Sequence, residues 1–134
     1  MITQRKTYFR KFEFINGEPH PVLLTILWIL RDRYNTPITI TDSGRTFREH
    51  SDLYKKKFPN SWQEKITWDS RHLPSIEHNY IRAVDFKLDN LKPEIIKNDI
   101  LDIAKNIGIF VGIGVGKNFI HLDIDREQDT VWKY

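Results

Sequence analysis

The sequence predicts an α+β fold in which a small antiparallel sheet is flanked by helices. Two stretches carry apolar residues at helical spacing, about 19–34 and 93–107, and the chain closes with strand-like runs over 109–116, 118–124 and 130–134. Helices that lie in stretches separate from an antiparallel set of strands are typical of the α+β class.

The length and composition indicate one domain that covers 1–134. Hydrophobic residues make up 40% and charged residues 29% of the chain, a balance that excludes a disordered protein. Because the chain contains no cysteine, disulfides are excluded and any metal must be bound by histidine or carboxylate side chains. The formal charge of +3 favours anionic surroundings only weakly.

The first third of the chain is expected to form a strand, a helix and a second strand. Charged and aromatic residues alternate over 6–14, as they do in a half-buried strand. Pro19 and Pro21 begin a helix that runs to about Tyr34. The β-branched run over 37–41 is a second, short strand. The buried face of the helix is expected to consist of four residues: Leu23, Ile26, Leu27 and Leu30.

The longest apolar run, over 22–30, is part of this helix. It is much shorter than the roughly 20 residues that a membrane-spanning helix needs. It also lacks the small-residue cleavage site of a signal peptide. We therefore expect no membrane span, and synthesis in the cytoplasm without a signal peptide.

The middle of the chain is expected to be mostly loop. A polar exit loop over 42–46 precedes a helix over 48–57, which ends before Pro59. His50 lies on the polar face of this helix and is expected to be solvated. The segment 60–79 shows few periodic signals and is predicted to be a long loop, a feature that is often functional.

The second half is expected to contain a strand, a helix and the three closing strands. The run over 81–88 is a predicted strand. Pro93 lies in the first turn of the next helix, and Gly108 follows its end. The buried stripe of that helix is predicted to be Ile96, Ile100, Ile103 and Ile107.

Three side chains form a candidate metal site: His72, Asp85 and His121. Imidazole nitrogen and carboxylate oxygen are good zinc ligands, and three of them leave a fourth position open for water, as in catalytic zinc sites. Asp85 and His121 lie on predicted strands, and His72 lies in the loop before one of them. The other interpretation is that these are ordinary core or surface residues, because five histidines and many acids make such a set easy to draw by chance.

The surrounding motifs resemble those of a known peptidase family. The runs "ITDSGRT", "SRH", "AVDF", "GIGV", "FIHLDI" and "VW" follow one another between Pro37 and Trp132. In this order they are similar to the zinc D-Ala-D-Ala carboxypeptidase and L-alanyl-D-glutamate endopeptidase family, whose fold is shared with the hedgehog signalling domain. The resemblance implies a fold of the hedgehog/DD-peptidase type and a bound zinc ion.

The resemblance also implies roles for individual residues. His72, Asp85 and His121 match the zinc ligands of the family. Ser70 matches the serine of its Ser-x-His motif and is expected to contact substrate. Arg45 matches the arginine that binds a substrate carboxylate or carbonyl, and a guanidinium fork suits either role and could stabilise an oxyanion.

The first zinc ligand departs from the family spacing. His72 precedes Asp85 by thirteen residues, whereas the family spacing is seven. His78 has the spacing of seven but no serine two positions earlier, and Ile81 stands where the family has glycine. We assign His72, because its Ser-x-His is preserved and a loop insertion costs little free energy. His78 remains the alternative.

The general base departs from the family as well. Many relatives carry an acid three residues before the last histidine, where this chain has Asn118. Asp123, two residues after His121, lies on the same strand face. It is expected to act as the catalytic base, or instead to hold His121 in the correct tautomer.

The expected function is zinc-dependent cleavage of peptide stems in bacterial peptidoglycan, by a monomer that acts on the cell wall as a phage or prophage product. The alternative is a non-catalytic zinc-binding or structural module of the hedgehog type. A nucleic-acid partner is not expected, because the interleaving of basic and aromatic residues also occurs on any amphipathic strand.

Overall fold

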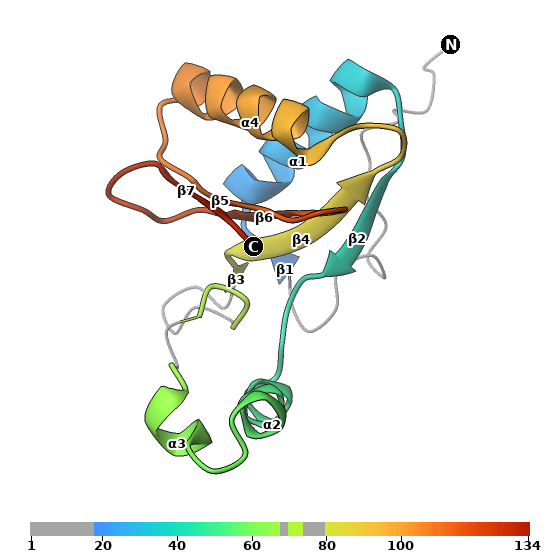
Figure 1. The fold of residues 1–134 in the computed structure, drawn as a ribbon. Coiled ribbons are helices and arrows are strands. Elements are labelled where there is room, and N and C mark those ends of the chain that lie inside the picture. Colours follow the sequence, from blue (N-terminus) through green and yellow to red (C-terminus); the bar gives the residue numbers. More distant parts are fainter. Residues whose placement is uncertain (1–17, 68–69, 74–79) are drawn as a thin grey trace.

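The computed structural model describes residues 18–67, 70–73 and 80–134. It confirms the α+β class, with a central sheet and helices on both of its sides (Figure 1). The helices are α1 (Pro21–Tyr34), α2 (Phe47–Lys57), α3 (Trp62–Lys65) and α4 (Pro93–Ile107), and the strands are β1 (Glu18–Pro19), β2 (Ile38–Asp42), β3 (Tyr80–Ile81), β4 (Ala83–Leu88), β5 (Gly112–Val115), β6 (Ile120–Asp123) and β7 (Thr130–Lys133). The strand expected over 6–14 lies outside the described residues.

The main sheet is mixed, so the prediction of a small antiparallel sheet is wrong in part. It has five strands in the order β2-β4-β6-β5-β7. The pairs β2–β4, β4–β6 and β5–β6 are antiparallel, but β7 runs parallel to β5. After β6 the chain reverses, and the place beside β6 is already occupied by β4. The last strand therefore adds to the far edge of β5, where its direction makes it parallel.

One face of the sheet packs against α1 and α4 (Figure 1). The alternation of buried apolar residues along the strands directs one set of side chains to these helices. The cluster includes the four predicted residues of α1, together with Val84, Phe86, Leu88, Ile113, Ile120 and Leu122 from the strands. A core on one face leaves the other face of the sheet available for polar side chains.

The second predicted helix stripe is confirmed at three positions and wrong at the fourth. Ile96, Ile100 and Ile103 are buried in α4, whereas Ile107 is 41% exposed and Ala104 is buried. A helical turn has 3.6 residues, so the apolar face drifts around the helix and Ile107 has left it by the last turn. Gly108 ends the helix with φ of +78°, a conformation that favours glycine.

Two expectations for the middle of the chain change in detail. The segment expected as one long loop contains the short helix α3, and a β-strand begins at Tyr80. The strand expected over 81–88 is split into β3 and β4 by Arg82, because β3 pairs with β1 in a separate parallel ribbon.

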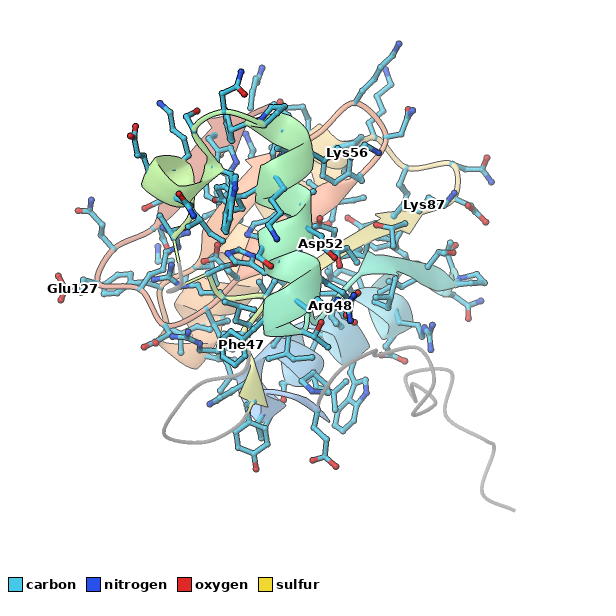
Figure 2. The ribbon with its side chains drawn as sticks, turned by 90° about the horizontal axis from the view of Figure 1, so that it is seen from below. Phe47, Arg48, Asp52, Lys56, Lys87 and Glu127 are labelled. Atoms are coloured by element: carbon cyan, nitrogen blue, oxygen red, sulfur yellow. The ribbon has the colours of Figure 1, made fainter. Side chains whose placement is uncertain are left out.

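The opposite face of the sheet is covered in part by α2 and α3. Figure 1 shows both helices on the side away from α1 and α4, and Figure 2 shows α2 lying across this face, with Phe47 and Arg48 labelled near one end. A capping box begins α2, since Thr46 and Glu49 each accept a backbone N–H from the other. This helix fixes where the exit loop of β2 turns.

Within the described ranges, no helix combines the length and apolarity needed to cross a membrane. The longest apolar run forms the buried side of α1, as expected from its helical spacing. Its apolar character is therefore explained by packing against the sheet.

Candidate metal centre

A row of directly opposed residues runs across the sheet on the face away from α1 and α4. Asp85 of β4 lies opposite His121 of β6, which in turn lies opposite Gly114 of β5. Gly114 is aligned with Trp132 of β7. Directly opposed residues direct their side chains to the same face. The strands therefore bring Asp85 and His121 together, with Nδ1 of His121 2.8 Å from Oδ1 of Asp85.

The third member of the set comes from the turn over 70–73. Nε2 of His72 lies 3.7 Å from Oδ1 of Asp85. Ligand atoms of His72, Asp85 and His121 all lie within 4.8 Å of one another, so this group could hold a metal ion. Both histidines are buried, and the Asp85 side chain is 18% exposed. The chemistry of two imidazoles and one carboxylate suits zinc, and a mostly buried set leaves little competing water.

His72 is oriented by the exit loop of β2. Its Nδ1 lies 2.6 Å from the carbonyl oxygen of Ser43, which can only accept, so Nδ1 carries the proton and Nε2 keeps its lone pair. The backbone N–H of Arg45 donates to the carbonyl of His72 at 3.0 Å. The hydroxyl of Ser70 accepts the backbone N–H of His72 at 3.3 Å. These bonds fix the turn so that Nε2 faces Asp85.

His121 is oriented by Asp123, two residues along β6. Nε2 of His121 lies 2.7 Å from Oδ2 of Asp123, which leaves Nδ1 directed at Asp85. The ring of Trp132 packs beside that of His121, with centroids 5.3 Å apart. The imidazole is therefore held between a carboxylate and an indole. In both histidines one nitrogen is bound by a supporting group and the other faces the shared site, the arrangement usual in metal-binding histidines.

The two histidines differ in their protonation. Burial lowers the pKa of His72, and its hydrogen bond to Ser43 and the negative charge of Asp85 offset this only in part. Burial would also lower the pKa of His121, but hydrogen bonds to Asp123 and Asp85 outweigh burial and raise it. A neutral His72 is ready to bind a metal, whereas a metal at His121 must displace the proton from Nδ1.

Asp123 is surrounded by positive groups at the end of β6. Arg126 donates to both of its oxygens, through Nε to Oδ1 and through Nη2 to Oδ2, and Nε of Arg71 lies 3.8 Å from Oδ1. Burial would raise the pKa of this carboxyl, but Arg126 and His121 hold the pKa of Asp123 at about 2. Both oxygens accept hydrogen bonds. Asp123 contacts the imidazole nitrogen that faces away from Asp85.

Acid is expected to destabilise the protein through Asp123. Its folded pKa of about 2 lies below the ordinary 3.8, so its contribution to the free energy of unfolding is full above about pH 4 and is lost as the pH falls toward 2. The shift corresponds to roughly 2 kcal/mol. Urea unfolding at pH 5 and pH 2.5, with chelator present throughout, measures this loss. In Asp123→Asn the same pH change should cost less by that amount, and an equal pH dependence in both proteins would contradict the assignment.

The two glycines of β5 make room for the groups that support the site. A Cβ atom at Gly112 would collide with the side chains of Asp123 and Arg126. A Cβ atom at Gly114 would lie 2.6 Å from Cε2 of Tyr134 and 2.7 Å from Nε1 of Trp132. Alternate glycines in a strand often mark such close approaches. The "GIGVG" run thus contained a signal for the crowding around His121.

The other two predicted site residues, Arg45 and Ser70, each form a hydrogen bond with the backbone of His72. Arg45 lies in the exit loop of β2, with Nη2 3.3 Å from Oδ2 of Asp42, and its charge helps to lower the pKa of His72. Ser70 contacts the backbone of His72 and lies in the same turn. His78 lies outside the described residues, so its assignment as the alternative first ligand stays a prediction.

Several supporting residues were missed in the sequence. The carbonyl of Ser43 has no sequence signal, because any residue offers one. Arg126 and Arg71 were also missed, although Arg126 directly follows the "LDID" acids, a spacing that indicates an ion pair. The expectation that His50 is solvated is wrong: it is 1% exposed, because Tyr54 and the carbonyl of Thr67 enclose its ring.

Comparisons with models of known protein families, with curated proteins and with solved structures find no match to this chain. The function is therefore argued from the side chains of the site and from the motif order of the sequence.

Proposed function

We propose that this chain is a zinc-dependent peptidase that cleaves the peptide stems of bacterial peptidoglycan. One observation carries the proposal: His72, Asp85 and His121 converge, and each histidine is turned toward the shared site by a bond to its other nitrogen. Each histidine thus presents one ring nitrogen to the Asp85 carboxylate: Nε2 of His72 with its lone pair, and Nδ1 of His121, whose proton a metal would displace. The motif order supports a fold of the hedgehog/DD-peptidase type.

Zinc fits the donors that are present. Three protein ligands match the number in catalytic zinc sites, which keep a fourth position open. Zinc bound there supplies a Lewis acid for a carbonyl oxygen and makes water nucleophilic near neutral pH. The partial exposure of Asp85, at 18%, offers a route by which substrate approaches the site.

The residues of the chain then have separate tasks. His72, Asp85 and His121 hold the metal. Asp123 orients His121 and keeps the imidazole basic, which its bonds to Arg126 support better than a role as proton acceptor. Arg45 binds the substrate carboxylate or carbonyl, since its side chain is 20% exposed and lies next to the turn of His72.

Peptidoglycan is the proposed substrate because the motifs resemble those of wall-cleaving peptidases. Both a carboxypeptidase and an endopeptidase activity are consistent with the site. We further propose that the protein acts as a monomer on the cell wall and derives from a phage or prophage.

Digestion of purified peptidoglycan tests the function. The zinc-loaded protein is incubated with sacculi, and the released peptides are identified by mass spectrometry. We expect a single type of peptide bond to be cleaved, with activity lost on chelation and restored by zinc. A zinc-replete protein that leaves every stem intact refutes the peptidase proposal, and metal analysis of the same sample shows whether zinc or another ion occupies the site.

Replacement of Arg45 by alanine is expected to raise KM for a stem peptide about tenfold, because a charged contact to substrate is lost. The value of kcat falls too if the guanidinium meets the developing oxyanion. Steady-state kinetics on a synthetic stem peptide measure both. Arg48→Ala is the matched control, since Arg48 is an exposed arginine three residues further along (Figure 2). Equal kinetics in Arg45→Ala and Arg48→Ala would remove Arg45 from the substrate site.

A non-catalytic zinc module is the second candidate, and one observation favours it. Both oxygens of Asp123 accept hydrogen bonds, and Asn118 stands where many relatives carry an acid, so neither residue is a free base. Such a module would bind muropeptides, with zinc present, and never cleave them. Binding measured by calorimetry alongside the digestion separates it from the peptidase.

A further inference from the structure

His50 is a buried histidine that the metal chemistry does not use. It is 1% exposed and is the buried residue of α2. The ring of Tyr54 covers it, with centroids 5.1 Å apart. A polar ring buried beneath an otherwise polar helix costs free energy unless its nitrogens form hydrogen bonds. The partners of the two nitrogens therefore show which groups the ring holds in place.

The two ring nitrogens of His50 have partners of opposite kind. Nε2 lies 2.6 Å from the carbonyl oxygen of Thr67, which can only accept a hydrogen bond. Nδ1 lies 3.4 Å from Nη1 of Arg45, which can only donate. Nε2 therefore carries the proton and Nδ1 accepts. The imidazole is neutral and is fixed in one tautomer.

This neutral acceptor fixes the Arg45 guanidinium from one side. On the other side Nη2 of Arg45 lies 3.3 Å from Oδ2 of Asp42, whose side chain is 37% exposed and thus screened by solvent. The backbone of Arg45 is tied to His72 by a 3.0 Å bond. An imidazole restrains the guanidinium and leaves its positive charge intact. A second carboxylate in the same place would neutralise that charge. A long flexible side chain otherwise loses rotamer entropy on binding substrate.

We propose that His50 is a positioning residue that pre-orients Arg45 for an anionic substrate group beside the metal site. The inference rests on the proposed function, because that function places Arg45 at the substrate. It names the group that Arg45 recognises as a peptide carboxylate. His50 itself touches no substrate. Its effect on binding is exerted through Arg45 alone.

A double-mutant cycle on binding and kinetics tests this. His50→Phe keeps an aromatic ring against Tyr54 and removes both nitrogens. We expect it to weaken binding of a stem peptide with a free carboxylate, and to raise KM, roughly tenfold in the wild-type background, with kcat changed far less. In the Arg45→Ala background the same change should alter both values by less than about twofold. His50→Gln, which keeps a donor and an acceptor, should restore most of the affinity.

Several results overturn the inference. These are an equal effect of His50→Phe in both backgrounds, or wild-type KM and affinity in a folded, zinc-loaded His50→Phe protein. If that variant does not fold, the ring ¹⁵N signals of His50 in the wild type decide. They should show a protonated Nε2 and an unprotonated Nδ1 whose signal moves in Arg45→Ala, and a protonated or unmoved Nδ1 overturns the inference. If the wild-type protein binds the stem peptide but does not cleave it, the peptidase proposal is refuted. The binding affinities of the double-mutant cycle still test the role of His50.

Discussion

Replacement of His121 by alanine is expected to reduce the zinc content of the protein from about one ion per chain to almost none. Removal of His72 or Asp85 should have the same effect, because two remaining ligands do not make a stable zinc site. The loss should exceed the roughly 10–100-fold decrease in affinity that follows removal of a supporting partner. Elemental analysis after dialysis measures the content, and circular dichroism shows that the fold is kept.

Two further histidines, His20 and His78, serve as controls for that experiment. His20 caps α1 by accepting the backbone N–H of Val22, so His20→Gln should keep its zinc. His78→Ala should keep it as well, because His72 already supplies the third ligand. Zinc retained in full by His121→Ala contradicts the site. Zinc lost from His78→Ala but kept by His72→Ala means that the family spacing of seven, and not the Ser-x-His, identifies the ligand.

The pairing of Asp85 with His121 could be anticipated from the sequence because both residues lie in strands with one buried face. In β4, Val84 and Phe86 are buried on the helix side, and in β6 Ile120 and Leu122 are buried there too. A shift of one residue would bury the polar set and expose the apolar one, so the hydrophobic pattern restricts which side chains share the polar face. Local alternation was therefore sufficient to predict that face.

The approach of His72 and the burial of His50 could not be anticipated in the same way. Each depends on a backbone carbonyl far away in the chain, Ser43 for His72 and Thr67 for His50. Backbone carbonyls are present at every position and leave no trace in a pattern of side chains. The strand at β7 was predicted, but its parallel direction was missed for a related reason: its place depends on which sheet edge is still free, a property of the whole fold.

Asp123→Asn is expected to lower the affinity for zinc by roughly 10–100-fold while full occupancy is still reached at saturating zinc. The asparagine oxygen can accept the bond from Nε2 of His121, but it lacks the negative charge that makes the imidazole more basic. Its amide N–H₂, at the position of Oδ1, also faces Nε–H of Arg126, which can only donate. Competition with a chelating dye measures the affinity, and kcat is measured at saturating zinc.

Affinity and turnover together separate the two roles that Asp123 can have. A residue that orients His121 changes zinc affinity first, and kcat falls only modestly once the site is filled. A general base leaves the affinity near wild type and lowers kcat by about 10²–10⁴. Asp125→Asn is the matched control, because Asp125 is an exposed carboxylate two residues further along that pairs with Arg82. Unchanged zinc affinity in Asp123→Asn would contradict the orienting role, whereas equal losses of affinity in Asp123→Asn and Asp125→Asn would mean that general negative charge, and not the bond to His121, supports the metal.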